Sequence, residues 1–328
     1  MTSLLNNKTF LDFFPAPELL LLSNSGIVVT DEDVKFVQLH RAILGGGFKL
    51  AHLNRVDGSN GMIEQGSDNY AELVSALKGL SLRYGVRHVQ ATLPDEKAYL
   101  FTTNVDKVLK KDLYDAVAFV IEENVPISLA ESIFDFEIVD ELSDSSNIKV
   151  AVTVLSKSTV DTYIELFEFA GITPISFDIE SQAIARAIIP RQDKRSHLIV
   201  NLFKRKTGFY IVSDKVVQFS STSNYGVDGD DLHSNINNLK EEMHKVITFW
   251  ESRADKSGKL EKKIEKIMVS GIGAGRKEFV EQLMNEVSIE YMLADIWVNV
   301  SFPRNQVPEM PFDESLDYAS AIGLVLPN

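Results

Sequence analysis

One order of predicted elements occurs twice along this chain, and that repetition restricts its fold more than any other feature. In the first copy, three short apolar segments separated by turn residues predict an antiparallel meander. Apolar residues then recur at the spacing of one helix face, at Ala71, Val74, Leu77 and Leu80. The predicted elements are strands at 26–30, 34–40 and 48–56, a helix at 68–84 and a strand at 86–93.

The second copy has the same order of meander, helix and strand. Its strands are predicted at 197–202, 208–212, 216–221 and 267–270, and its helices at 231–253 and 277–287. This order begins a ribonuclease-H-like subdomain, so two copies predict an α/β protein with two similar lobes. The segment 98–171 differs, with three strands and two helices, and is expected to be an inserted α+β subdomain.

These elements define the expected domain boundaries. We expect an N-terminal arm, a first lobe in two segments that is completed by a C-terminal helix, an insert and a second lobe. The corresponding ranges are 1–24 for the arm, 25–97 and 172–195 with 315–328 for the first lobe, 98–171 for the insert and 196–314 for the second lobe.

Charge and composition exclude several classes of function. The chain has 47 acidic and 33 basic residues, a formal net charge of −14, which disfavours binding to nucleic acid or to anionic lipid. It contains no cysteine, which is consistent with a reducing cytoplasm. The most apolar early run, 13–22, holds two prolines and a glutamate and is too short to span a bilayer, so no direct membrane span is expected.

Three adjoining segments carry a resemblance to a known family. Lys149–Lys157 is followed by Val160–Pro174, which contains an Ala-Gly turn and a proline, and by Phe177–Arg186, which contains Asp-Ile-Glu-Ser. Two further matches are Asp115–Pro126 and Asp317–Leu326. In order and spacing, these segments resemble the type IV pilus assembly protein PilM family, which is part of the actin-like superfamily together with the division protein FtsA.

The resemblance implies an actin-like ATPase fold with a reduced second lobe. In family members a small subdomain, 2B, lies before the long helix of the second lobe and forms part of the adenine pocket. Here Gly226-Val-Asp-Gly229 runs almost directly into the helix that is predicted from 231, so most of that subdomain is expected to be missing.

The resemblance also implies a nucleotide cleft with two glycine-containing hairpins, and neither hairpin matches the pattern. In the first, Val28 replaces an acidic residue and Thr30 a glycine, and three acids at 31–33 would repel phosphate. In the second, Asn201 replaces an acidic residue and Phe203 a glycine.

Basic residues occupy 204–206 of the second hairpin and are interpreted as a solvated turn. Of the family's nucleotide-binding elements, only the glycine turn near 271 is retained. The vestigial nucleotide site is expected to comprise Thr30, Asp31, Lys35, Asn201, Gly271 and Gly273.

The leading hypothesis is a cytoplasmic scaffold held at the inner membrane by its partners, with no catalytic residue, no metal site and no cofactor. The family implies capture of the N-terminal tail of PilN, an inner-membrane protein, between the insert and the first lobe, with PilO-like and pilus ATPase components as further partners. The groove is expected to contain Leu93, Leu100, Phe119 and Ile121. The alternative is an active ATPase that binds ATP and Mg²⁺ in the cleft.

Overall fold

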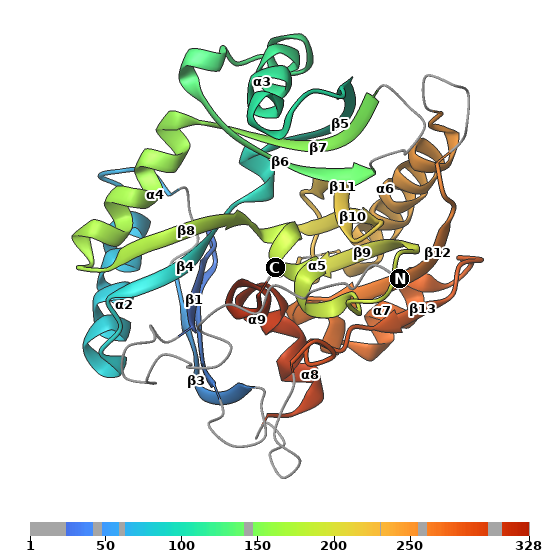
Figure 1. Cartoon of the computed structure of the whole chain (residues 1–328). Helices are drawn as coiled ribbons and strands as arrows, with labels where there is room; N and C mark the ends of the chain where they lie inside the picture. Colours follow the sequence, from blue (N-terminus) through green and yellow to red (C-terminus); the bar gives the residue numbers. More distant parts are fainter. Residues whose placement is uncertain are drawn as a thin grey trace, which may run out of the picture.

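Two five-stranded sheets with the same connectivity form the body of the protein (Figure 1). The strand orders are β3-β2-β1-β4-β8 and β11-β10-β9-β12-β13. In each sheet the first three strands are antiparallel neighbours, and the last two strands join in parallel. The identical order confirms the predicted repetition of one structural unit.

Most strands of the two sheets overlap predicted segments, whereas the strands at 173–179 and 291–293 were not predicted. The first sheet comprises β1 (Asn24–Val29), β2 (Asp33–Arg41), β3 (Phe48–Asp57), β4 (His88–Leu93) and β8 (Thr173–Ile179). The second comprises β9 (Ser196–Leu202), β10 (Thr207–Ser213), β11 (Val216–Ser223), β12 (Ile264–Ser270) and β13 (Tyr291–Leu293).

This computed structural model describes residues 24–41, 48–58, 63–140, 147–229, 231–254, 261–300 and 310–327. Apart from Asn24, the predicted N-terminal arm therefore lies outside the described residues.

The insert is a three-stranded antiparallel sheet covered by one helix. Its strands β5 (Tyr99–Asp106), β6 (Ser132–Asp140) and β7 (Asn147–Ser156) have the order β5-β7-β6, and its helix is α3 (Leu113–Asn124). The insert has a hydrophobic core of its own, in which Val117 of α3 packs with Val150 and Val152 of β7.

Helix α4 (Lys157–Phe169) corrects the predicted boundary of the insert, which placed this helix inside it. Its buried residues Leu166 and Phe167 belong to the hydrophobic core of the first lobe, together with Leu73 and Leu77 of α2 (Asp68–Tyr84). The apolar face of α4 is therefore satisfied by the first lobe, and only the segment up to β7 forms the insert.

The helices cover both faces of the first sheet. Helices α2 and α4 pack on the face that includes Ile27, whereas α5 (Glu180–Ile188) and α9 (Ala319–Val325) lie against the opposite face, which includes Val28. Helix α2 begins at the cap Ser67, whose hydroxyl accepts the Tyr70 N–H, and ends at Gly85 with a left-handed φ of 66°.

Helices α5 and α9 join the two lobes, because their core is continuous with that of the second sheet. The remaining helices are α6 (Leu232–Ser252), α7 (Lys277–Met284) and α8 (Phe312–Ser315). None of the helices within the described ranges has the length and apolar character needed to cross a membrane.

Candidate functional site

The turn of the first hairpin, between β1 and β2, is closed by its own side chains. The Thr30 hydroxyl accepts the backbone N–H groups of Glu32 at 3.1 Å and of Asp33 at 3.0 Å. It also donates to the Asp33 carboxylate at 2.9 Å. Thr30, predicted to replace a phosphate-binding glycine, is buried. Its hydroxyl group fixes the conformation of the acidic turn through these three hydrogen bonds.

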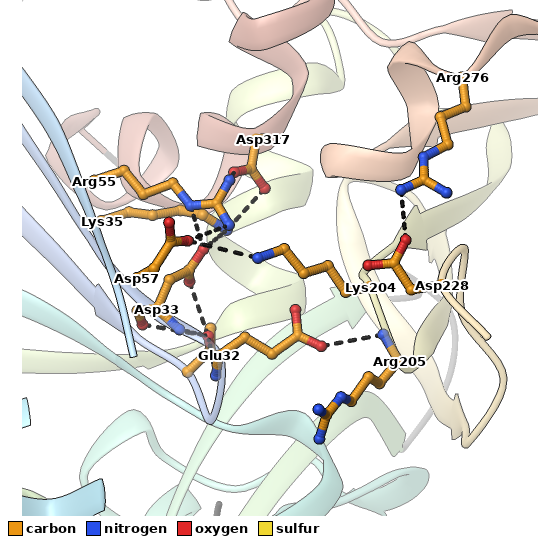
Figure 2. A network of polar contacts seen from close by, with 11 residues as sticks. Glu32, Asp33, Lys35, Arg55, Asp57, Lys204, Arg205, Asp228, Arg276 and Asp317 are labelled. Atoms are coloured by element: carbon orange, nitrogen blue, oxygen red, sulfur yellow. Dashed lines mark hydrogen bonds and ion pairs between the residues drawn. The ribbon is translucent and has the colours of Figure 1, made fainter. Parts of the chain in front are cut away.

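The basic turn between β9 and β10 contacts that acidic turn directly (Figure 2). The Arg205 backbone N–H donates to the Glu32 carboxylate at 3.1 Å. The Lys206 ammonium lies 3.0 Å from Asp31 and 2.7 Å from Glu96, which follows β4. Lys204 makes a longer pair of 3.5 Å with Asp57 of β3. We call these seven residues the interlobe clasp: Asp31, Glu32, Asp57, Glu96, Lys204, Arg205 and Lys206.

The clasp corrects the interpretation of 204–206 as a solvated turn. Lys206 has only 13% of its side chain exposed. Burial alone would lower the pKa of Lys206, but the carboxylates of Glu96 and Asp31 outweigh burial and raise the pKa above its usual value. The Lys206 ammonium is therefore charged and already neutralised by the first lobe.

Lys35 of β2 belongs to a second ion network next to the clasp, in which Lys35, Asp33 and Asp317 are buried (Figure 2). Its ammonium lies 2.8 Å from Asp317 and 3.5 Å from Asp33. Arg55 of β3 contacts the same two carboxylates, at 2.8 Å from Asp33 and 3.1 Å from Asp317. The Lys35 ammonium is thus paired with Asp33 of the same strand and with Asp317 of the segment before α9.

A buried aspartate adds another link between the lobes. Asp95, directly after β4, accepts the Ser181 backbone N–H at 2.8 Å and the Ser220 hydroxyl of β11 at 3.2 Å. The Ser181 hydroxyl also donates to Asp95. Burial raises the pKa of Asp95 to about 6, and the hydrogen bonds from Ser181 limit the rise.

The glycine turn at 271–275 is packed by the chain itself. Gly271 has a left-handed φ of 87°, and a Cβ at this position would lie 2.5 Å from the Leu202 carbonyl and 2.8 Å from the Asn201 side chain. A Cβ on Gly273 would collide with Val227. These glycines permit the close approach of the turn to β9, and Asn201 is buried beneath it.

A groove of about 880 Å³ lies beside the insert, between two sheet edges. One wall is β6, an edge strand of the insert, and the other is β8, an edge strand of the first sheet. Apolar residues from both walls line it, among them Ile133 and Ile138 of β6 and Phe177 and Ile179 of β8. We call it the β6–β8 groove.

Of the four residues predicted for a partner groove, Leu93 lines the β6–β8 groove. Leu100 of β5 is half-buried and packs on the lobe cores, and Ile121 is fully buried inside the insert. Phe119 is 77% exposed on α3, away from the groove lining. In the strand order β5-β7-β6, β6 is the edge strand of the insert that borders the groove.

The comparisons with known proteins agree with this architecture. A family model described as type IV pilus assembly protein PilM matches residues 26–241, about two thirds of the chain. The chain belongs to the PilM family. No curated protein sequence matches it significantly.

Solved structures support the fold of this PilM family member. A PilM–PilN type IV pilus biogenesis complex matches with a TM-score of 0.76 at 17% identity, over 94% of this chain and 98% of the matched chain. The ethanolamine utilization protein EutJ from Carboxydothermus hydrogenoformans matches with a TM-score of 0.51 at 10% identity, over 94% and 91%. The predicted actin-like ATPase fold is therefore confirmed.

Proposed function

We propose that this PilM family member is a scaffold of type IV pilus assembly that holds an extended cytoplasmic segment of a PilN-like inner-membrane protein in the β6–β8 groove. The observation that carries the proposal is a groove between two sheet edges whose lining includes apolar residues from both edge strands. Family membership and the fold of a solved PilM–PilN complex support the choice of partner.

Binding by strand addition fits both walls of the groove. Edge strands present backbone N–H and C=O groups that an extended peptide can pair, while side-chain pockets select its alternate residues. The apolar residues of β6 and β8 provide such pockets, and Arg186 and Asp178 at the groove form an ion pair of 2.8 Å that supplies a polar border. No titratable group is needed for this kind of capture.

The proposal also places the protein in the cell. A chain held through the tail of a membrane protein lies at the cytoplasmic face of the inner membrane. PilO-like and pilus ATPase components would then be reached through the same assembly, and the acidic net charge of −14 disfavours direct contact with anionic lipid.

The groove is tested by removing its apolar character without disturbing the core. Ile133 is 43% exposed and Ile138 is 38% exposed, so the double variant I133D/I138D is expected to fold. We expect it to weaken binding of a synthetic PilN-like N-terminal peptide by about tenfold or more, measured by calorimetry, because two apolar contacts are lost.

The matched control is F119D, an equally polar change on the exposed face of α3 outside the groove lining. It is expected to leave the affinity for the peptide unchanged. If F119D weakens binding and I133D/I138D does not, the peptide binds on α3 and the groove assignment is wrong.

We further propose that the protein is a pseudo-ATPase. The acidic turn at 31–33 offers carboxylates where phosphate would lie, and the ammonium groups of Lys204 and Lys206 are paired with carboxylates of the first lobe. A nucleotide would have to break these pairs and face the freed carboxylates.

Calorimetry with Mg-ATP tests this part of the proposal. We expect no measurable binding heat, in a sample that still binds the peptide. Binding in the low-micromolar range would favour the alternative of an active ATPase and would show that the clasp opens.

A further inference from the structure

A second cavity lies in the first lobe beside the clasp and has no role in the proposed function. It has a volume of about 400 Å³ and is bordered by the ends of β1 and β4, by the first turns of α4 and by Glu180, the first residue of α5. Apolar residues contribute to its lining, among them Val29, Leu93, Pro94 and Tyr163.

Glu180 is the unusual group in this cavity. Only 6% of its surface is exposed, and no hydrogen bond or ion pair engages its carboxyl group in the part of the chain that the structure describes. Burial raises the pKa of Glu180 to about 8, although the neighbouring Lys35 and Lys206 oppose the rise. A buried carboxyl group without a partner is unfavourable when ionised, and a ligand that supplies a partner gains that interaction.

The charges around Glu180 select a cation as that partner. Lys206 is paired with two carboxylates of the clasp, Asp31 and Glu96, and Lys35 is paired with Asp33 and Asp317. Among the described residues that line the cavity, four carry carboxyl groups and two are basic: Asp31, Glu64, Glu96 and Glu180 against Lys97 and Lys206. A phosphate or carboxylate ligand would meet this excess of negative charge.

We propose that the cavity binds an alkyl ammonium group, with the ammonium on the Glu180 carboxylate and the alkyl chain against apolar lining residues such as Val29, Leu93 and Tyr163. These apolar residues favour an alkyl chain, and a single buried carboxylate suits a compact ammonium ion better than a divalent metal, which requires several oxygen ligands. The ammonium is that of a lysine side chain in a bound protein segment or that of a free diamine.

The proposal is tested with small probes on the full chain. Nα-acetyl-lysine amide presents the alkyl ammonium, Nα-acetyl-norleucine amide has the alkyl chain without it, and putrescine represents free diamines. In ligand-detected NMR titrations we expect the lysine derivative to bind about tenfold or more tightly than the norleucine derivative. If putrescine competes with the lysine derivative, the site also accepts free diamines. If the lysine derivative binds and putrescine does not compete, the site is assigned to lysine side chains of protein segments.

Two variants of the same cavity separate a specific contact from general charge. Glu180→Gln is expected to abolish the preference for lysine, whereas Glu64→Gln, at an exposed position of the lining, is expected to retain it. Equal binding of the lysine and norleucine derivatives to the natural protein, or an equal loss in the two variants, would overturn the proposal.

The natural protein provides a test that needs no variant. The lysine ammonium stays charged up to about pH 10, whereas the Glu180 carboxyl group must ionise to pair with it. Affinity for the lysine derivative is therefore expected to rise about tenfold per pH unit as the pH approaches 8. An affinity that is constant between pH 6 and pH 8 would contradict the role of Glu180.

Discussion

Replacing Lys35 by methionine is expected to lower the free energy of unfolding by about 3 kcal/mol, near the lower end of the range for breaking a buried ion pair. Methionine preserves the apolar stem, but it leaves the buried carboxylates of Asp33 and Asp317 without the ammonium that lies 3.5 Å and 2.8 Å from them. Arg55 still contacts both carboxylates, which limits the loss. Urea unfolding of the full chain measures the effect.

The control is K245M on the surface of α6, where Lys245 makes an equally short pair of 2.9 Å with Glu242 but is 65% exposed. No measurable change in stability is expected there, because water screens the pair. The double variant K35M/D317N is expected to recover part of the loss, since it removes one of the uncompensated charges. A K35M variant as stable as the natural protein would mean that Lys35 does not hold these carboxylates together.

The parts of the fold that sequence predicts are those with local signals. Helix α2 was predicted with the bounds that it has, because one apolar face, a serine cap and a glycine in the left-handed region all act within a few residues. The two meanders likewise follow from alternating strands and turn residues. Both copies contain the same types of element in the same order along the chain, and the two sheets accordingly have the same strand order.

The parts that sequence did not predict depend on pairings between distant segments. The acidic run at 31–33 and the basic run at 204–206 are both visible in the sequence, but no local feature indicates that they face one another. No strand was predicted at 173–179, where Pro174 lies near the start of β8 and an edge strand tolerates the missing N–H. Without β8 as an edge, the β6–β8 groove could not be anticipated.

The candidate nucleotide residues illustrate the same limit. The departures from the family pattern at Val28, Thr30 and Phe203 are visible in the sequence. The intramolecular contacts that the candidate residues make in the folded protein are not. Thr30 closes its own turn, and Lys35 joins a buried network with a residue near the C-terminal end of the described chain. Glu180 was noticed only as part of a family motif, because its isolation in a cavity depends on the surrounding three-dimensional packing.

Glu180 leads to the second large effect, a decrease in stability as the pH rises through neutrality. Its pKa increases from 4.5 in the unfolded chain to about 8 in the folded protein, mainly because burial disfavours the charged form. The folded protein therefore retains a proton that the unfolded chain releases, so this contribution is complete below pH 4.5 and is lost as the pH rises to about 8. Between pH 6.5 and pH 8 the free energy of unfolding is expected to fall by about 2 kcal/mol.

This pH window isolates Glu180 from two other titrations. The raised pKa of Asp95, about 6, places its contribution at lower pH. Burial lowers the pKa of His197 from its usual 6.5, so its contribution increases stability as the pH rises past 6.5 and is opposite in sign to that of Glu180. Urea unfolding at several pH values should therefore show a slope for the natural protein and for Glu64→Gln, and none for Glu180→Gln. A slope that persists in Glu180→Gln would assign the titration to another group.

The same measurement connects stability with the proposed ammonium site. A saturating alkyl ammonium holds the Glu180 carboxylate ionised in the folded protein and thereby lowers its pKa toward that of the unfolded chain. Because binding stabilises the folded state more strongly at pH 8 than at pH 6.5, the fall in stability across the window is expected to shrink when Nα-acetyl-lysine amide is present. With Nα-acetyl-norleucine amide the fall in stability should stay unchanged. An equal response to both compounds would mean that the ammonium group does not pair with Glu180 and would contradict the proposed site.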